Sequence, residues 1–127
     1  MPCPFCDIDK TRIVIESELA FVIRDGFPIS PGHTLIIPKR HVSSFFETIQ
    51  EEKLALLKLI DSAKKNIETE FKPHAYNIGI NDGQAAGQTV PHLHIHLIPR
   101  YEGDVKDPRG GVRWIIPEKA DYWSGRE

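Results

Sequence analysis

The segment TVPHLHIHLIPR, residues 89–100, places a histidine at every second position, at His92, His94 and His96. Side chains along a β-strand alternate between its two faces, so the three imidazoles should share one face. The leucine and isoleucine residues between them should share the other face and pack on a core. The segment therefore predicts a sheet with one buried face, and half of the six histidines of the chain lie on the opposite face.

Other runs of sequence predict the remaining strands. RIVIESELAFVIRD favours two short strands at 13–15 and 20–24, joined as a hairpin across ESE. HTLIIPK predicts a strand at 33–37, ended by the proline that follows, and AYNIGIN predicts another at 75–81. The histidine-bearing strand itself is expected over 92–98.

One long helix is expected between these strands. Apolar residues recur there at three- and four-residue steps, which is typical of an amphipathic helix with one face on the core. Thr48 and Glu51 fit a capping box at its start, and the helix should end near Glu70. Its apolar positions are Leu54, Leu57, Ile60, Ala63 and Ile67. Strands before and after one helix, with tight links between neighbours, favour an antiparallel sheet with the helix on one face, the α+β class.

Length and charge limit the possible classes of protein. The 127 residues suit a single domain, 1–127, whose C-terminal segment (101–127) we expect to be mostly irregular. The formal net charge of −2 does not indicate a nucleic-acid or membrane surface, and no apolar run is long enough to span a bilayer. MPCPFCDIDK lacks the pattern of a signal peptide, so a soluble cytoplasmic protein is expected. Neither a G-x-G-x-x-G fingerprint nor a Walker A lysine loop is present.

The three alternating histidines allow three chemical interpretations. On a strand the outer two lie about 13 Å apart, so all three could hold one metal ion only if the backbone bent severely. A solvated strand face is the second alternative. In the third, a neutral imidazole whose one nitrogen donates to a fixed acceptor attacks phosphorus with its other nitrogen. His94 is then the natural nucleophile, because imidazoles flank it, and Asn81, Gln88 and Thr89 in the preceding loop can hold the phosphate charge.

These motifs resemble a known family. GQTVPHLHIHLIPR resembles the signature of the histidine-triad (HIT) family, PGHTLIIPKRHV its second hallmark and NDGQAAGQ its phosphate loop, while CPFCDI is similar to the start of many bacterial members. The resemblance covers roughly residues 3–100 in order. It implies an antiparallel sheet of about five strands with one long helix, two subunits that join their sheets in a homodimer, and hydrolysis or transfer of nucleoside monophosphate groups.

The resemblance also implies roles by position. His94 is the nucleophile that takes the nucleotidyl group, His96 flanks the α-phosphate, and His33 supports the other histidines from behind. Asp25 matches the residue that binds the ribose hydroxyls. The residues that match phosphate contacts are Asn81, Gln88 and Thr89. From the residues alone, Asp25 and Asn81 could also be ordinary turn residues, and His33 a core histidine.

The type of reaction follows from small differences between branches of the family. The transferase branch, similar to galactose-1-phosphate uridylyltransferase, carries glutamine where this chain has His96, which favours hydrolysis. The fragile-histidine-triad branch, which cleaves diadenosine polyphosphates, has the closer pattern. The nucleoside phosphoramidases usually show Gly-Gly-Arg after the histidines, where this chain reads LIPRY. A phosphoramidase and a non-catalytic dimeric nucleotide-binding protein remain the alternatives.

Two metals are expected beside this chemistry. Cys3 and Cys6 have a C-x-x-C spacing, which in a reducing compartment indicates a metal half-site or a redox pair. By resemblance to some bacterial HIT proteins, His41 and His92 would complete a structural Zn²⁺ site with them; the alternative is two free thiols. Mg²⁺ is expected to neutralise the polyphosphate leaving group.

Overall fold

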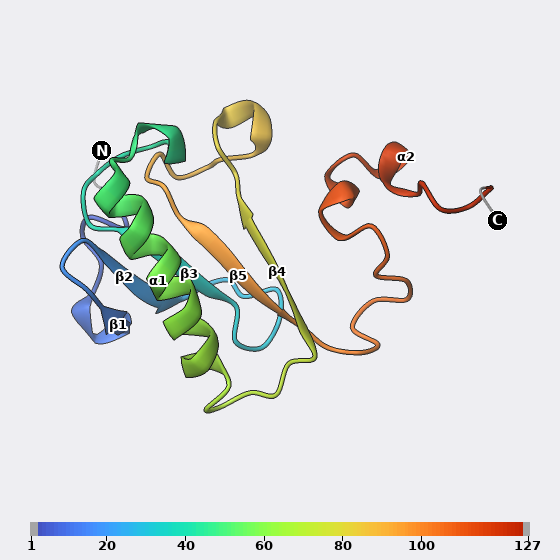
Figure 1. Ribbon diagram of the computed structural model, residues 1–127, viewed down its shortest axis with the longest axis horizontal. Coiled ribbons are helices and arrows are strands. Elements are labelled where there is room, and N and C mark those ends of the chain that lie inside the picture. Colours follow the sequence, from blue (N-terminus) through green and yellow to red (C-terminus); the bar gives the residue numbers. More distant parts are fainter. Residues whose placement is uncertain (1–2, 126–127) are drawn as a thin grey trace.

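The computed structural model describes residues 3–125 and confirms the α+β fold. A five-stranded antiparallel sheet has the strand order β1-β2-β3-β5-β4 (Figure 1). The main elements are β1 (Ile13–Glu16), β2 (Ala20–Arg24), β3 (Thr34–Pro38), α1 (Gln50–Ile67), β4 (Ala75–Ile80) and β5 (Ile95–Arg100). Four short 3-10 helices (Lys10–Arg12, Phe45–Glu47, Gln84–Ala86 and Gly111–Ile115) and the one-turn α2 (Pro117–Ala120) complete the described chain. None of the helices within residues 3–125 is long and apolar enough to cross a membrane.

The two faces of the sheet have different covers. Helix α1 lies across one face (Figure 1), and the main core there joins its apolar side to alternate residues of the central strands. The opposite face carries a smaller cluster, Phe21, Ile23, Leu35 and Ile37, packed against Phe5, Ile8 and Ile13. Because strand residues alternate between faces, His96 comes out on the side away from α1, beside this smaller cluster.

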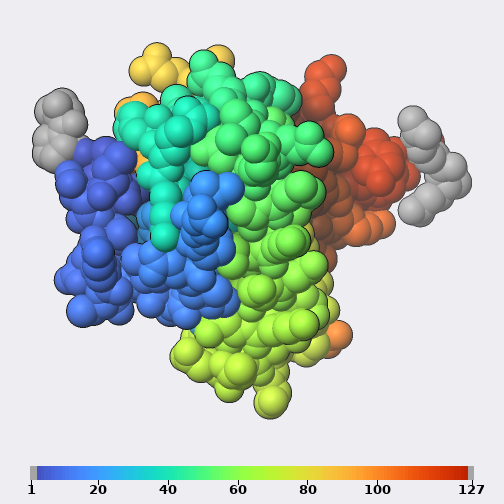
Figure 2. Space-filling view, turned by 60° about the vertical axis from the view of Figure 1, so that its left-hand side comes forward, coloured from blue at the N-terminus to red at the C-terminus, as the bar shows by residue number. Residues whose placement is uncertain are grey.

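The helix is rotated from the predicted orientation in its first half. The residues that it buries are Glu52, Leu56, Leu59, Ala63 and Ile67. Leu54 and Leu57, predicted to face the core, are 50% and 57% exposed. The outward side of α1, coloured green, faces the viewer in Figure 2. The prediction was wrong because residues 54–57 are all apolar, so spacing alone fits more than one face.

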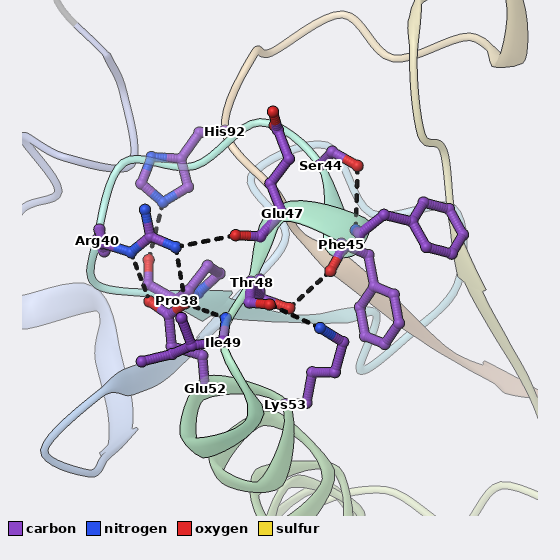
Figure 3. A network of polar contacts seen from close by, with 11 residues as sticks. Pro38, Arg40, Ser44, Phe45, Glu47, Thr48, Ile49, Glu52, Lys53 and His92 are labelled. Atoms are coloured by element: carbon purple, nitrogen blue, oxygen red, sulfur yellow. Dashed lines mark hydrogen bonds and ion pairs between the residues drawn. The ribbon is translucent and has the colours of Figure 1, made fainter.

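The start of α1 also differs from the predicted capping box. Thr48 donates its hydroxyl to the carbonyl of Phe45, while Glu52, not Glu51, accepts the N–H of Ile49 at 3.0 Å. The Glu52 carboxylate is buried and receives two hydrogen bonds of 2.9 Å from Arg40 (Figure 3). This paired buried charge fixes the rotation of the first helical turn. The helix ends at Ile67, three residues before the predicted end.

The histidine-bearing strand begins later than predicted. β5 starts at Ile95, so among the three histidines only His96 lies in the sheet, opposite Leu35 of β3. The segment before it turns, with the N–H of His92 donating to the carbonyl of Val90 at 2.8 Å. The expectation that all three imidazoles share one face is therefore wrong. His94 and His96 line one pocket, whereas His92 is fully buried and does not line it.

Candidate active site

A pocket of about 480 Å³ lies on the sheet face away from α1. It runs from His94 and His96 across β3 to Asp25, which follows the last residue of β2. Phe5 from the N-terminal segment forms part of its wall, with a ring centroid 5.0 Å from that of His94. The pocket therefore brings together residues that are more than 60 positions apart in the sequence.

The orientation of His94 is set by the residue two positions before it. Its Nδ1 lies 2.9 Å from the carbonyl oxygen of His92. A carbonyl can only accept, so Nδ1 carries the proton and a neutral ring leaves the lone pair on Nε2. That arrangement suits a nucleophile, because the reactive nitrogen is free and the ring cannot turn without losing a hydrogen bond.

A second hydrogen-bonded chain sets the proton of His96. The backbone N–H of Ile29 donates to Nδ1 of His33 at 3.2 Å, so the proton of a neutral His33 sits on Nε2. That Nε2 lies 3.0 Å from Nδ1 of His96 and 3.3 Å from Oδ2 of Asp25. His96 therefore accepts at Nδ1 and keeps its own proton on Nε2, where it can donate to a ligand.

Burial keeps these supporting imidazoles neutral. It lowers the pKa of His96 to about 4, with added contributions from His94 and His33. Burial also lowers the pKa of His33, and the negative charge of Asp25 opposes that shift. At neutral pH both rings are uncharged hydrogen-bonding groups rather than cations.

Asp25 is held in place by the turn that it begins. Its Oδ1 accepts the N–H of Phe27 at 2.8 Å, and its own N–H donates to the carbonyl of His33 at 2.9 Å. The carboxylate is thus oriented in the pocket wall before any ligand arrives. A carboxylate with acceptor capacity to spare suits a pair of sugar hydroxyls.

The predicted phosphate loop divides into two functions. Asn81 and Thr89 line the pocket, as does Gly87, whose φ of +95° allows the sharp turn. Gln88 lies elsewhere: its Oε1 accepts the N–H of Gly83 at 2.8 Å, and its Nε2 donates to the carbonyls of Ser43 and Val90. Its side chain holds the loop in shape instead of lining the pocket.

The two cysteines meet His41 and His92 at a separate cluster. Sγ of Cys3 lies 3.3 Å and Sγ of Cys6 3.5 Å from Nδ1 of His92. Nδ1 of His41 lies 3.2 Å from both Sγ of Cys6 and Nδ1 of His92. A tetrahedral zinc ion would separate its ligand atoms by roughly 3.4–3.8 Å, so the cluster is close to that size. Nε2 of His92 donates to the carbonyl of Pro38 at 2.8 Å (Figure 3), which leaves Nδ1 free to bind a metal.

Asp25, His33 and His96 also lie close enough to share an ion, but their hydrogen bonds oppose it. A metal on Nε2 of His33 would displace the proton to Nδ1, where the N–H of Ile29 already donates. Two N–H groups would then face each other. The structure thus separates the cluster of Cys3, Cys6, His41 and His92 from the hydrogen-bonded cluster at His96.

Three pocket features were not expected from the sequence. Phe5 lies between the two cysteines of the C-x-x-C motif, and nothing in the spacing marks its ring as a pocket wall. Arg12 also lines the pocket, from the turn before β1. Ile29 acts through its backbone N–H, for which a side-chain motif offers no signal.

Comparison with known proteins shows the family to which this chain belongs. A model of the HIT domain matches residues 8–103. The chain belongs to the HIT family. Its solved structural neighbours include a histidine triad nucleotide-binding protein of Sulfolobus tokodaii, with a TM-score of 0.74 and 35% identity over 80% of this chain and 70% of that one. A zinc-bound histidine triad family protein of Mycobacterium smegmatis has a TM-score of 0.73 and 35% identity, covering 82% of this HIT protein and 78% of the neighbour.

Curated relatives of this HIT protein include named enzymes. The bis(5'-nucleosyl)-tetraphosphatase of Schizosaccharomyces pombe is 44% identical over 97 residues, which cover 76% of this chain and 53% of the relative. The bis(5'-adenosyl)-triphosphatase of Saccharomyces cerevisiae is 34% identical over 116 residues, covering 90% and 53%. The chain spans about half the length of these two enzymes. An uncharacterised HIT-like protein of Mycoplasma genitalium is 39% identical over 104 residues, covering 79% and 74%.

Proposed function

We propose that this HIT protein is a nucleotide hydrolase that cleaves dinucleoside polyphosphates, or related nucleotidyl conjugates, at the α-phosphate. The proposal rests on one observation above all: Nδ1 of His94 donates to the carbonyl of His92, which leaves Nε2 as a fixed nucleophile at the pocket. Two relatives named as dinucleoside polyphosphate hydrolases support this class of substrate.

The reaction would proceed in two displacements at phosphorus. First, Nε2 of His94 forms a bond to the α-phosphorus while the bond to the oxygen of the leaving polyphosphate breaks. Nε2–H of His96 donates to the reacting phosphate, and Asn81 and Thr89 hold its other oxygens. Water then attacks the same phosphorus and releases a proton to solvent, while the nitrogen–phosphorus bond breaks and its electron pair returns to Nε2 of His94. The products are a nucleoside monophosphate and the remaining polyphosphate nucleotide. Mg²⁺ bound to the polyphosphate would neutralise the leaving group.

Substitution of His94 tests this proposal. His94→Ala should lower turnover of diadenosine tetraphosphate by several orders of magnitude, while nucleotide binding stays within a few-fold, because Asp25 and the loop remain. His74→Ala, at an exposed histidine outside the pocket, is the control. Wild-type protein quenched during turnover should carry an acid-labile, base-stable nucleotidyl group on His94. Substantial activity in His94→Ala, or an adduct on another histidine, contradicts the assignment.

The same assay separates the alternatives. An adenosine phosphoramidate offered beside diadenosine polyphosphates ranks the phosphoramidase branch against the hydrolase branch. A protein that binds nucleotides and turns over neither substrate is a binding protein. Catalysis is favoured over binding alone because the hydrogen bonds of His94 and His96 support the tautomers that nucleophilic attack needs.

We further propose that the cluster of Cys3, Cys6, His41 and His92 holds a structural zinc ion. The free Nδ1 of His92 and the ligand spacing support it, as does the zinc-bound neighbour of Mycobacterium smegmatis. The cytoplasmic location expected from the sequence would keep both thiols reduced. The carbonyl of His92 also accepts the hydrogen bond from Nδ1 of His94. A zinc ion bound to His92 would therefore help to fix the orientation of the nucleophilic ring.

Metal analysis decides the zinc proposal. Protein purified without chelators should contain about one zinc per chain by plasma emission. Cys6→Ser should lower that content and the melting temperature, since metal binding contributes to folding. Ser17→Ala, at a residue outside the cluster, should leave the zinc content unchanged. A zinc content near zero in the wild type would exclude the site.

We also propose a homodimer that forms at β4. This strand has one neighbour, β5, whereas β1 at the other edge has an irregular register between Ile13 and Ile15 that blunts edge pairing. Ile78 of β4 is 51% exposed, and its partner Leu97 belongs to the core under α1, so Ile78 points to the α1 side. The C-terminal segment beyond β4 in Figure 1 exposes Trp114 and Ile115 as well. A second subunit would cover this apolar surface.

A further inference from the structure

The pocket ends at a cation that the proposed chemistry does not use. Arg12 is the last residue of the 3-10 turn Lys10–Arg12, directly before β1, and it lines the same pocket as His94. Its Nη2 donates to the carbonyl of Arg24 at 3.1 Å. A Cβ added at Gly26 would lie 3.5 Å from the same nitrogen. The guanidinium is therefore held beside residues 24–26, next to Asp25.

The order of strands places this guanidinium beyond the sugar. From β5 the sheet continues through β3 and β2 to β1, and neighbouring strands are about 4.8 Å apart. Arg12 thus enters the pocket from the strand roughly 14 Å from the histidines, with Asp25 at the end of the strand next to it. If the α-phosphate lies at His94 and the ribose at Asp25, the base must point toward Arg12. This placement rests on the proposed function.

The guanidinium has donors available for that base. An arginine has five N–H donors and no acceptor. One donates to Arg24, and the other four have no hydrogen-bond partner among residues 3–125. Guanine offers two neighbouring acceptors, O6 and N7, which suit paired donors of arginine. Adenine offers N7 beside an amino group, which would face another donor.

We infer that Arg12 makes the pocket selective for 6-oxopurine nucleotides, so that guanine-containing dinucleoside polyphosphates are preferred over adenine-containing ones. Arg12 contacts the base edge, whereas His94, His96 and Asp25 act on the phosphate and the sugar. The consequence is a preference set by a single side chain that lies outside the histidine motif.

Equilibrium binding of mononucleotides tests the inference without turnover. Titration calorimetry would compare GMP, IMP and AMP; IMP differs from AMP by a carbonyl in place of the amino group. Wild-type protein should bind GMP and IMP about tenfold more tightly than AMP. Arg12→Ala should bring all three affinities to within about twofold of one another. Lys10→Ala removes a cation from the same turn but not from the pocket, so it should keep the wild-type ratio.

Several outcomes would overturn the inference. Equal affinity for IMP and AMP in the wild type does so, as does an unchanged ratio in Arg12→Ala. An equal loss for all three nucleotides would show that Arg12 acts only as a general charge. Thermal melting of Arg12→Ala checks that its hydrogen bond to Arg24 is not needed for folding, and Arg12→Lys provides a charged variant without the paired donors.

Failure of the proposed function gives a different pattern. A wild type that prefers IMP but hydrolyses no dinucleoside polyphosphate keeps Arg12 as the base-selective residue and removes the hydrolase assignment. Hydrolysis of diadenosine and diguanosine tetraphosphates with equal kcat/KM, together with equal binding of IMP and AMP, keeps the hydrolase assignment and excludes Arg12 as the base-selective residue. A wild type that binds none of the three mononucleotides contradicts both.

Discussion

Three histidines within five residues have three distinct environments. His92 uses Nε2 to bind a carbonyl and presents Nδ1 to two thiols. His94 donates from Nδ1 and presents Nε2. His96 accepts at Nδ1 from His33 and keeps a proton on Nε2. The difference comes from the hydrogen-bond partner of each ring, not from the spacing between them.

Loss of the Asp25 carboxylate should affect binding more than chemistry. We expect Asp25→Ala to raise KM by about tenfold, the effect of removing a charged hydrogen-bond acceptor from a sugar, with a smaller fall in kcat. Steady-state kinetics with a dinucleoside tetraphosphate would measure both. Asp61→Ala, at an exposed helical position, should leave KM unchanged. An unaltered KM in Asp25→Ala would exclude the ribose role.

His96 should make the fold sensitive to mild acid. Its native pKa of about 4 lies below its ordinary value of 6.5, so between these values the unfolded chain binds a proton that the folded chain does not. The stabilisation is complete above pH 6.5 and decreases as the pH falls toward 4. Urea denaturation at pH 7 and pH 5 should show a smaller decrease in unfolding free energy for His96→Gln than for the wild type. Equal decreases would contradict the low pKa.

At the scale of elements, helix α1 links the core to the cluster of Cys3, Cys6, His41 and His92. Glu52 in its first turn holds Arg40, which precedes His41 in the chain, and also caps the helix at Ile49 (Figure 3). The turn of α1 and the segment after β3 are therefore tied together by one buried carboxylate. The pKa of Glu52 is lowered chiefly by this arginine, so the pair stays charged at neutral pH.

The rotation of α1 can be checked with two adjacent leucines. Leu56 is 1% exposed and Leu57 is 57% exposed. Leu56→Ala should lower the unfolding free energy by about 2–5 kcal/mol, because it removes buried methyl groups and leaves a cavity. Leu57→Ala should change it by less than about 0.5 kcal/mol in the monomer. Denaturant titrations would measure both, and the reverse order would support the rotation predicted from spacing.

At the scale of the whole molecule, the sheet has two unequal edges. β1 is short and irregular, whereas β4 runs for six residues beside β5 in continuous register. An exposed, regular edge next to apolar side chains is a surface that a second subunit can extend. The dimer proposal therefore concerns β4 and the adjoining side of α1.

Sedimentation would test the dimer. Wild-type protein at micromolar concentration should sediment with the mass of two chains. Ile78→Arg should shift it to one chain, because a charge in the middle of the interface cannot be paired by its symmetry mate. Val14→Arg, at a comparably exposed position on β1, should remain dimeric. A wild type that sediments as one chain would contradict the proposal and leave the site chemistry unaffected.

The sequence by itself determined the strand runs, the single long helix and the family. These depend on local patterns: apolar alternation, helical spacing and contiguous motifs, which short-range geometry turns directly into structure. The α+β class followed from the order of those elements. The limits of β2 match the prediction, and those of β1, β3 and β4 differ by at most one residue. β5 begins three residues later than predicted, because the turn at His92 depends on a contact between the N–H of Leu93 and the carbonyl of Val42.

Only the tertiary structure decided the rotation of α1, the position of Gln88 and the proton on each imidazole. Residues 54–57 are uniformly apolar, so the choice of buried face required the sheet and the partner of Glu52. The side-chain amide of Gln88 could bind either a phosphate or the backbone, and in the fold its Nε2 donates to the carbonyls of Ser43 and Val90. The tautomer of His33 depends on the N–H of Ile29, and that of His96 on His33, 63 residues away. Sequence spacing carries no information about such contacts, because they form only when distant segments meet in the folded chain.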